Sequence, residues 1–361
     1  MKVLLVSTLE RGGPVEQTLL LARGLRELGV SVAVTCADER IAARFAAAAI
    51  EARPLPMRAG LDLAAARRLW RLMRSADIVH AQDRRAGLWV RVAPRILGAA
   101  RIYTVHGLPD PYMPPPVGDE HPRLRDRIAY EVVDSGLGRR ADALIIPSRA
   151  LAETFVTRLR LPARRVTVVP NGVDEVDRVT ERGPDVGTLA LLEPVKDIST
   201  FLRAAELLSA QRPQLRFVIA GDGSERASLE RECAERGLTD VVTFAGYLPR
   251  EEVLARLSVL VLTSVVENAP MALLEAMSAG IPIVASRTGG IPELLGDDAG
   301  RLVTPGDAEG FAAEIARLLD DRALAESQIS AGVRRVAERY TVQVNARATL
   351  AVYKRALSAR G

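Results

Sequence analysis

Short apolar segments alternate with amphipathic segments along the whole 361-residue chain. The apolar segments carry hydrophobic residues at consecutive positions, which is typical of strands covered on both faces of a parallel sheet. Strands that alternate with helices predict layers of helices on both sides of such a sheet. We expect strands at residues 2–7, 30–36, 77–81, 100–106, 143–148, 166–170, 187–192, 215–221, 241–246, 259–264 and 282–286, and helices at 15–28, 61–74, 198–211, 225–236, 250–257, 270–279 and 308–319.

With 361 residues, the chain is longer than the usual size of a domain with one hydrophobic core, so we expect two domains. The polar, turn-rich stretch 171–187 is the best linker candidate. The prediction is an α/β protein with two doubly wound Rossmann-like domains facing across a cleft, at residues 1–175 and 185–341. The last helix, about 342–361, is expected to return to the first domain. Ligands of such sheets bind at the carboxyl ends of the strands, and the proline-rich stretch 107–122 is expected to form a surface loop near the cleft.

Charge is divided unevenly along the chain. Residues 1–170 hold 27 Lys and Arg against 17 Asp and Glu, a balance of +10, whereas the remainder holds 22 against 28, a balance of −6. A basic first half predicts an anionic partner there, either a phosphorylated substrate or a lipid surface. The helix 61–74 has an arginine face, which we interpret as a solvated face, with docking on an anionic membrane as the alternative. Aromatic residues make up only 4% of the chain, which disfavours nucleic-acid binding.

The sequence contains no apolar run long enough to span a membrane. The opening segment "MKVLLVSTLERGG" is interpreted as a buried strand and not as a signal peptide. Cys36 and Cys233 lie in apolar or helical contexts in different halves, so we expect two buried thiols. These features predict a cytoplasmic protein, with peripheral contact at the inner membrane face as the alternative.

The segment "VLVLTSVVENAPMALLEAMSAGIPIV" predicts a strand, a loop, a helix and a second strand. Pro270 suits the first turn of a helix, and Gly280 suits its end. The backbone N–H groups of Met271, Ala272 and Leu273 would then point into the loop. Together with the helix dipole, these amides predict an anion site.

Two glutamates, Glu267 and Glu275, lie on either side of this helix start. A carboxylate at Glu275 could accept hydrogen bonds from the two vicinal hydroxyls of a ribose. Glu267 lies in the loop and could bind the hydroxyls of a sugar beyond the phosphates. The spacing therefore fits a ribose–pyrophosphate–sugar ligand across a helix N-terminus, while a helix that merely contains glutamates is an equally good interpretation of the pattern alone.

Ten segments in the same order resemble the retaining glycosyltransferases of family 4, which have the GT-B fold. They are "ERGGPVEQ", "DIVHAQ", "YTVHG", "RRADALIIPS", "VTVVPNGVD", "LLEPVKD", "FVIAGDGSERASLE", "VTFAGYL", the segment quoted above and "ASRTGGIPELL". The resemblance implies transfer of a hexose from a UDP- or GDP-sugar to a glycan, a lipid-linked sugar or a small molecule. It also implies retained anomeric configuration and neither a metal nor another cofactor.

The resemblance also assigns roles to individual residues. Glu275 resembles the ribose-binding glutamate, Glu267 the glutamate that holds sugar hydroxyls, and His106 the histidine that contacts the transferred sugar. Lys196 resembles the lysine that neutralises the donor diphosphate, where negative charge grows as the bond to the sugar breaks. We keep His80 as structural. The remaining donor-binding candidates are backbone positions: Gly12, Gly13, Gly221, Asp222, Gly223, Asn268, Ala269, Pro270, Met271, Ala272 and Leu273.

One position departs from the family pattern. The family normally has an arginine five residues before the lysine, and this chain has Leu191 there. An arginine bonded to phosphate contributes about 1.5–3 kcal/mol. Its absence implies slow turnover, a donor held differently, loss of catalysis, or compensation by another arginine such as Arg11 or Arg287.

The chemistry that the resemblance implies is displacement of the nucleoside diphosphate on the face of attack, with the leaving phosphate helping to accept the acceptor's proton. Two alternatives stay open: a non-catalytic or weakly active nucleotide-sugar-binding protein, and a nucleotide-sugar epimerase or hydrolase. An oxidoreductase is disfavoured because no G-x-G-x-x-G motif follows the first strand of either half.

Overall fold

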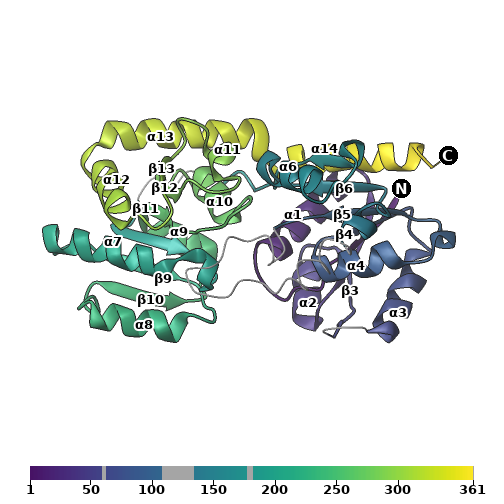
Figure 1. The fold of residues 1–361 in the computed structure, drawn as a ribbon, viewed down its shortest axis with the longest axis horizontal. Coiled ribbons are helices and arrows are strands. Elements are labelled where there is room, and N and C mark those ends of the chain that lie inside the picture. Colours follow the sequence, from purple (N-terminus) through teal and green to yellow (C-terminus); the bar gives the residue numbers. More distant parts are fainter. Residues whose placement is uncertain (59–61, 108–133, 177–181, 361) are drawn as a thin grey trace. The chain divides into compact units, whose positions relative to one another are not determined.

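The computed structural model describes residues 1–58, 62–107, 134–176 and 182–360 (Figure 1). The chain divides into two compact units. Within the described residues, unit 1 contains 1–107, 134–172 and 340–360, and unit 2 contains 173–339. Unit 1 is therefore discontinuous in sequence, because the described part of unit 2 lies between its segments. Most of the proline-rich stretch 107–122 lies outside the described residues.

Unit 1 is built on a seven-stranded parallel sheet in the order β3-β2-β1-β4-β5-β6-β7. The central strands β1, β4, β5 and β6 are apolar and almost wholly buried, because helices cover both faces. The strands are β1 Lys2–Val6, β2 Ser31–Cys36, β3 Glu51–Pro54, β4 Ile78–Ala81, β5 Ala100–Thr104, β6 Ala143–Ile146 and β7 Val166–Val168.

Two helical layers cover this sheet. The helices α3, α4 and α6 bury Leu69, Trp89 and Phe155 against one face, whereas α1, α2 and α14 bury Leu25, Phe45 and other apolar side chains against the opposite face. The bounds are α1 Gly13–Glu27, α2 Glu39–Ala47, α3 Leu63–Met73, η1 Arg95–Leu97, α4 Arg84–Val92, α6 Arg149–Thr157, η3 Ala163–Arg165 and α14 Val342–Ser358.

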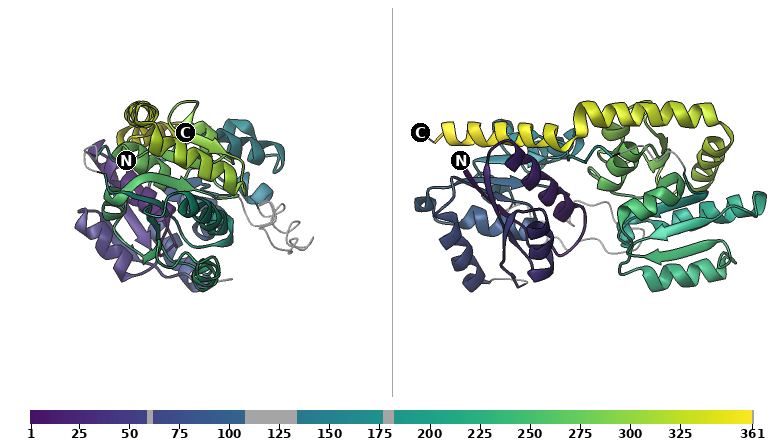
Figure 2. Two further views of the ribbon diagram at one scale, coloured as in Figure 1. Left: turned by 90° about the vertical axis from the view of Figure 1, so that its left-hand side faces the viewer. Right: turned by 180° about the vertical axis from the view of Figure 1, so that it is seen from behind.

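The last helix, α14, lies along α1, so the end of the described chain belongs to unit 1 (Figure 2). The two helices meet at Gly24, where a Cβ atom would lie 2.8 Å from the side chains of both Val342 and Ala346. A glycine at this position lets the backbones approach closely. Tyr353 of α14 is completely buried in the core of unit 1.

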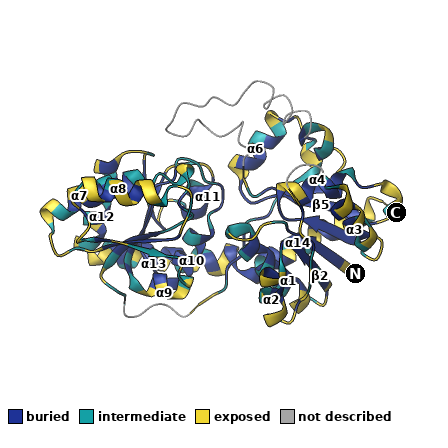
Figure 3. Ribbon diagram, turned by 90° about the horizontal axis from the view of Figure 1, so that it is seen from below, coloured by how far each residue is buried: buried dark blue, intermediate teal, exposed yellow. Residues whose placement is uncertain are grey.

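Unit 2 repeats the architecture with six parallel strands in the order β10-β9-β8-β11-β12-β13. Its helix α12 packs on α7, and α10 packs on α13. In both units the central strands are largely buried and the outer faces of the helices are exposed (Figure 3). The elements are β8 Asp185–Leu189, η4 Pro194–Lys196, α7 Ile198–Gln211, β9 Phe217–Ala220, α8 Arg226–Glu235, β10 Val242–Gly246, α9 Arg250–Arg256, β11 Leu257–Leu262, α10 Met271–Ala279, β12 Ile283–Ser286, α11 Ile291–Leu295, β13 Arg301–Val303, α12 Ala308–Asp320, α13 Arg322–Arg335 and the π-helix η5 Val336–Tyr340.

The predicted class, two doubly wound parallel sheets, is confirmed. The sequence did not predict the edge strands β3 and β13, nor the helices α2, α4, α6, α11 and α13. The predicted linker 171–187 extends too far toward the C-terminus, because β8 already begins at Asp185. In this strand Asp185 pairs with Leu257 of β11, and Val186 pairs with Phe217 of β9. None of the described helices combines the length and apolar character that crossing a membrane requires.

Candidate functional site

The strand order of unit 2 reverses direction between β8 and β11. From β8 the sheet continues to β9 and β10, and from β11 it continues to β12 and β13. In doubly wound sheets, ligands bind at the carboxyl ends of the strands beside such a reversal. Lys196 follows β8 and Glu267 follows β11, so the fold brings these two predicted residues to that place.

Lys196 and Glu267 form an ion pair between Nζ and Oε1. The Ser264 hydroxyl donates a second hydrogen bond to Oε1 of Glu267 at 3.1 Å. The two loops are also joined through their backbones, since the Thr263 hydroxyl donates to the carbonyl of Lys196 at 3.0 Å and the Val265 amide donates to the carbonyl of Val195 at 2.9 Å. The side chains of Lys196 and Glu267 are 22% and 10% exposed, so the pair is largely but not completely shielded from water.

Residues that follow β12 also contact the loop that carries Glu267. The Thr288 hydroxyl donates to the carbonyl of Val265 at 2.9 Å. Gly289 has a φ of +51°, and a Cβ atom there would lie 1.7 Å from the carbonyl oxygen of Glu267. Only glycine fits this contact. The position of Glu267 is therefore fixed by the loops that follow three neighbouring strands.

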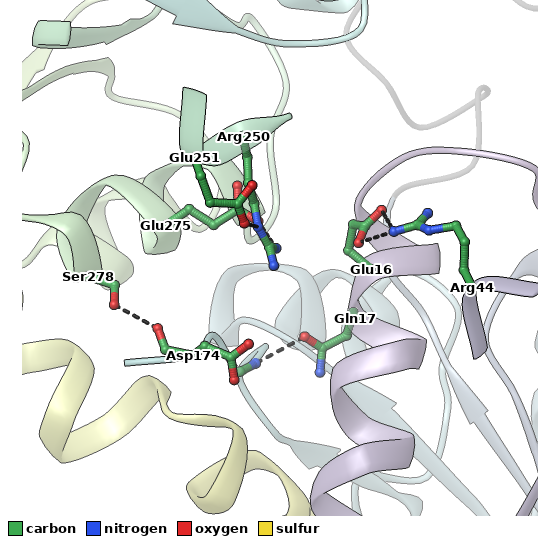
Figure 4. A network of polar contacts seen from close by, with 9 residues as sticks. Glu16, Gln17, Arg44, Asp174, Arg250, Glu251, Glu275 and Ser278 are labelled. Atoms are coloured by element: carbon green, nitrogen blue, oxygen red, sulfur yellow. Dashed lines mark hydrogen bonds and ion pairs between the residues drawn. The ribbon is translucent and has the colours of Figure 1, made fainter. Parts of the chain in front are cut away.

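Glu275 lies in α10 and is buried, with 8% of its side chain exposed. Its Oε1 accepts a hydrogen bond from Nη1 of Arg250 at 2.9 Å, and Nε of the same arginine donates to Oε1 of Glu251 at 2.9 Å (Figure 4). These acidic partners raise the pKa of Arg250 despite its burial. The sequence analysis missed Arg250, because no local pattern relates α9 to α10.

The helix α10 begins one residue later than predicted. Pro270 is its N-cap, with φ −65° and ψ 126°, and Met271 is the first helical residue. The Leu273 amide donates to the carbonyl of Pro270 at 3.2 Å, so one of the three amides that were expected to face a ligand is used within the turn. Asn268 and Ala269 are buried before the cap, and Gly280 ends the helix in the left-handed region as predicted.

Close contacts with the neighbouring backbone explain why the "GDG" loop has glycine at both of its ends. Gly221 has a φ of +135°, and a Cβ atom there would lie 1.8 Å from the carbonyl of Ala190. At Gly223 a Cβ atom would lie 2.3 Å from the carbonyl of Leu192. Asp222 between them is exposed, and its Oδ2 lies 3.8 Å from Nη1 of Arg226. The loop after β9 thus packs directly on the loop after β8, beside Lys196.

In unit 1 the predicted residue His106 lies after β5, partly buried. Its Nε2 donates to Oε1 of Gln82 at 3.3 Å. Burial lowers the pKa of His106 to about 4, so the imidazole is neutral at pH 7. Gln82 ends the "DIVHAQ" segment, but the sequence analysis gave it no role.

His80 is structural, as predicted. It is completely buried, with Nδ1 at 2.6 Å from the hydroxyl of Tyr353 and Nε2 at 2.6 Å from the hydroxyl of Thr104. The amide nitrogen of Gln82 lies 3.1 Å from Nδ1 of His80. Burial and the neighbouring His106 lower the pKa of His80 to about 3. This neutral network joins α14 to the carboxyl ends of β4 and β5.

The glycine pair of unit 1 opens α1. Gly12 is its N-cap with a φ of +96°, a backbone conformation that favours glycine, and Gly13 is the first helical residue. Glu16 in the first turn forms a bidentate ion pair with Arg44, with both distances 2.8 Å (Figure 4).

Leu191 is partly exposed in the loop after β8, and its carbonyl accepts a hydrogen bond from the Glu193 amide at 2.9 Å. Arg287 is exposed in the loop after β12, and Arg11 is exposed in unit 1. Within the described part of the chain, no three His, Cys, Asp or Glu side chains are grouped as metal ligands would be.

Known proteins resemble this chain along most of its length. Residues 11–176 match the family model Glycosyltransferase Family 4, and residues 175–335 match Glycosyl transferases group 1. The chain is 32% identical over 290 residues to 2-deoxystreptamine glucosyltransferase of Streptomyces kanamyceticus, covering 74% of this chain and 73% of that protein. It is 29% identical over 317 residues to glycogen synthase of Mycobacterium tuberculosis, covering 82% and 72%. The crystal structure of HepE from Anabaena with UDP and glucose superposes with a TM-score of 0.82 at 19% identity, covering 98% of this chain and 99% of that chain. This likeness confirms the predicted fold.

Proposed function

The chain belongs to the family 4 glycosyltransferases, and on that premise we propose that it transfers a hexose from a UDP- or GDP-sugar with retention of anomeric configuration. The acceptor is a glycan, a lipid-linked sugar or a small molecule. Named relatives support a hexose, since they include a glucosyltransferase and a glycogen synthase. UDP and glucose were bound in the related fold of HepE, which supports a nucleoside diphosphate as the leaving group.

One observation carries this proposal: Lys196 and Glu267 meet at the strand-order reversal of unit 2, and Glu275 lies eight residues further on in the adjoining helix. A ligand with a diphosphate between a ribose and a sugar has the chemistry that these groups recognise. We assign the diphosphate to Lys196 and the first turn of α10, the ribose to Glu275 and the sugar hydroxyls to Glu267. Asn268, Ala269 and Pro270 present backbone to the sugar.

The charge of Lys196 has a chemical purpose in this assignment. As the bond between the anomeric carbon and the phosphate oxygen breaks, negative charge grows on the leaving diphosphate. A fixed cation and helix amides lower the free energy of that state. The acceptor oxygen bonds to the anomeric carbon on the same face, and its proton passes to the leaving phosphate oxygen. The proposed reaction requires no metal ion.

For unit 1 we propose acceptor binding and a contact with the transferred sugar. A neutral His106 donates from Nε2 to Gln82, which fixes the orientation of the ring at the end of β5. The resemblance to the family assigns His106 the contact with a hydroxyl of the sugar. Gly12 and Gly13 let backbone approach a charged ligand closely. A cytoplasmic location and contact with an anionic membrane stay predictions from the sequence.

A thermal-shift screen with UDP, GDP and their hexose derivatives tests the donor. A ligand at a hundred times its dissociation constant stabilises the protein by about 2.7 kcal/mol, which raises the melting temperature measurably. Glu275→Gln should remove most of the shift, while its fold remains intact. Equal shifts in the wild type and in Glu275→Gln would contradict the assignment of the ribose.

Incubation with the bound donor, with and without acceptors and with a chelator, tests the reaction. The proposal predicts a retained product in the presence of acceptor, little free sugar in its absence and no effect of the chelator. Rapid release of free sugar from the donor alone would favour a hydrolase. Leu191 favours a second candidate, a weakly active nucleotide-sugar-binding protein, which tight nucleotide binding without turnover over a broad acceptor panel would support.

A further inference from the structure

Arg250 is the partner of the buried carboxylate of Glu275, although it lies 25 positions away in the chain. The arginine begins α9, directly after the turn that follows β10, and Pro249 caps this helix. Its side chain extends to α10, where Nη1 bonds Oε1 of Glu275 at 2.9 Å (Figure 4). Two elements from different parts of the sheet thus meet through this one ion pair.

The two carboxylates bound to Arg250 differ in burial. The Glu275 side chain is 8% exposed, whereas that of Glu251 is 71% exposed. Loss of the partner of a buried charge is far more costly than loss of the partner of a surface charge. Loss of the pair with Glu275 is therefore expected to cost more than loss of the pair with Glu251.

The geometry of the guanidinium adds a directional constraint. Its Nε is bonded to Glu251 and its Nη1 to Glu275, so the planar group is fixed at two points. A planar fork held in this way fixes the position of the Glu275 oxygen that it binds, which a lysine ammonium on a flexible stem cannot do. A carboxylate with a fixed orientation loses less conformational entropy when a ligand's hydroxyls bind to it.

We propose that Arg250 is a positioning residue for the donor nucleoside: it holds the Glu275 carboxylate so that the vicinal hydroxyls of the ribose can donate hydrogen bonds to it. This inference rests on the proposed function, since it takes Glu275 as the ribose-binding group. Arg250 acts through Glu275. Its removal is expected to weaken recognition of the ribose hydroxyls and to leave the bond-breaking chemistry at Lys196 largely unchanged.

The test compares UDP and GDP with their 2′-deoxy counterparts by isothermal titration calorimetry. The wild type should bind the ribonucleotide at least about 10-fold tighter than the 2′-deoxy form, because the charge-assisted hydrogen bond of the 2′-hydroxyl is lost. In Arg250→Ala the ribonucleotide should bind about 10-fold more weakly, and the ratio between the two forms should approach one. In turnover assays KM for the donor should rise with kcat changed less than about threefold.

Arg301→Ala provides the matched control. Arg301 is also ion-paired to a glutamate, Glu314, and its side chain is 34% exposed against 32% for Arg250. It lies in β13, away from both α9 and α10. This variant should keep the wild-type ratio, which separates a specific role of Arg250 from the general loss of an arginine pair.

Arg250→Lys keeps the charge without the fork and protects the test if the alanine variant does not fold. In this variant the logarithm of the ratio between the dissociation constants of the 2′-deoxy nucleotide and the ribonucleotide should fall to half of its wild-type value or less. An unchanged preference in Arg250→Lys, or in a folded Arg250→Ala, would overturn the inference while leaving the proposed function intact. Failure of the wild type to bind either ribonucleotide would overturn the proposed function and this inference with it.

Discussion

The two units share one topology and differ in the side chains at the carboxyl ends of their strands. Both sheets run outward in the same order from a first central strand, β1 in unit 1 and β8 in unit 2. In unit 2 these ends carry ion pairs, Lys196 with Glu267 and Arg250 with Glu275. In unit 1 the ion pair of Glu16 with Arg44 lies at the start of α1, and the buried side chains at the ends of β4 and β5 form a neutral network around His80. The same backbone plan thus carries ion pairs beside the strand-order reversal of unit 2 and a buried neutral network in unit 1.

The largest expected effect comes from removing the charge of Lys196 in unit 2. Lys196→Ala should lower kcat by about a hundredfold to a thousandfold, because removing one group that stabilises developing negative charge typically costs about 2.7–4 kcal/mol in the transition state. Steady-state transfer assays measure the change. Lys354→Ala, an exposed lysine in α14 of unit 1, is the control and should keep wild-type activity. A kcat of the Lys196 variant within threefold of wild type would remove the main chemical argument for unit 2.

Next in size is a change in the backbone of the loop after β9. Gly221→Ala should destabilise unit 2 by about 3 kcal/mol, because the new methyl group collides with the carbonyl of Ala190 in a conformation that favours glycine. Gly29 of unit 1 has a φ of +76° but open space around it, so Gly29→Ala should cost only about 1 kcal/mol. Urea unfolding of both variants gives the two free energies. Equal costs would show that the contact with Ala190 relaxes.

Tyr353→Phe tests the neutral network around His80 in unit 1. The substitution removes the hydroxyl partner of Nδ1 in the buried His80, which should reduce the free energy of unfolding of unit 1 by about 1–3 kcal/mol. Tyr247 in unit 2 is 77% exposed, and Tyr247→Phe should change stability by less than about 0.5 kcal/mol. Denaturant titration of both variants is the measurement, and an unchanged midpoint for Tyr353→Phe would contradict the network.

The pH dependence of stability should also differ between the units. Burial lowers the pKa of His80 to about 3, below its ordinary value, so the unfolded chain binds more protons at mildly acidic pH. The stabilisation is complete above about pH 6.5 and is lost as the pH falls, by up to about 1.4 kcal/mol per pH unit. All three histidines precede residue 172, so unit 2 contains none. His106 of the same unit, whose pKa burial lowers to about 4, contributes in the same direction. His80→Asn should therefore reduce the slope measured by urea unfolding between about pH 7 and pH 5 by roughly half, and an unchanged slope would assign the dependence to other groups.

The smallest expected effect concerns Leu191. If another arginine compensates for the one that the family pattern places there, Leu191→Arg should change the transfer rate by less than about threefold. Arg287→Ala in the same assay identifies the compensating residue, since Arg287 lies in unit 2 and is exposed. A large rise in rate for Leu191→Arg would reject compensation and would mark the natural enzyme as weakened at this position.

The sequence predicted the parts of the fold whose apolar pattern is strong. The predicted helix 198–211 agrees with α7 to the residue, and the last helix, predicted at about 342–361, begins at Val342 and ends three residues earlier, at Ser358. The missed strands β3 and β13 lie at the edges of their sheets and are short, with charged residues, so they lack a buried-strand pattern. The edge strands β7 and β10 are more apolar and were predicted, at 166–170 and 241–246.

The candidate site was predictable only where motifs are local. Glu267 and Glu275 stand around a helix start, and Lys196 stands after a predicted strand, so pattern and family resemblance found them together. The contact of Glu275 with Arg250, by contrast, joins residues 25 positions apart on separate helices. The contact of His80 with Tyr353 joins residues 273 positions apart. Such pairs are products of tertiary packing, and the roles of all these residues in catalysis stay predictions.

The return of α14 to unit 1 has a consequence for biosynthesis. When residue 339 has left the ribosome, the nascent chain contains all of unit 2 but lacks the helix that packs on α1 and fills the core with Tyr353. Domains usually fold in the order in which they are synthesised. In this chain unit 1 is begun before unit 2 and completed after it, so the apolar surface of α1 that packs on α14 stays uncovered until α14 has been synthesised.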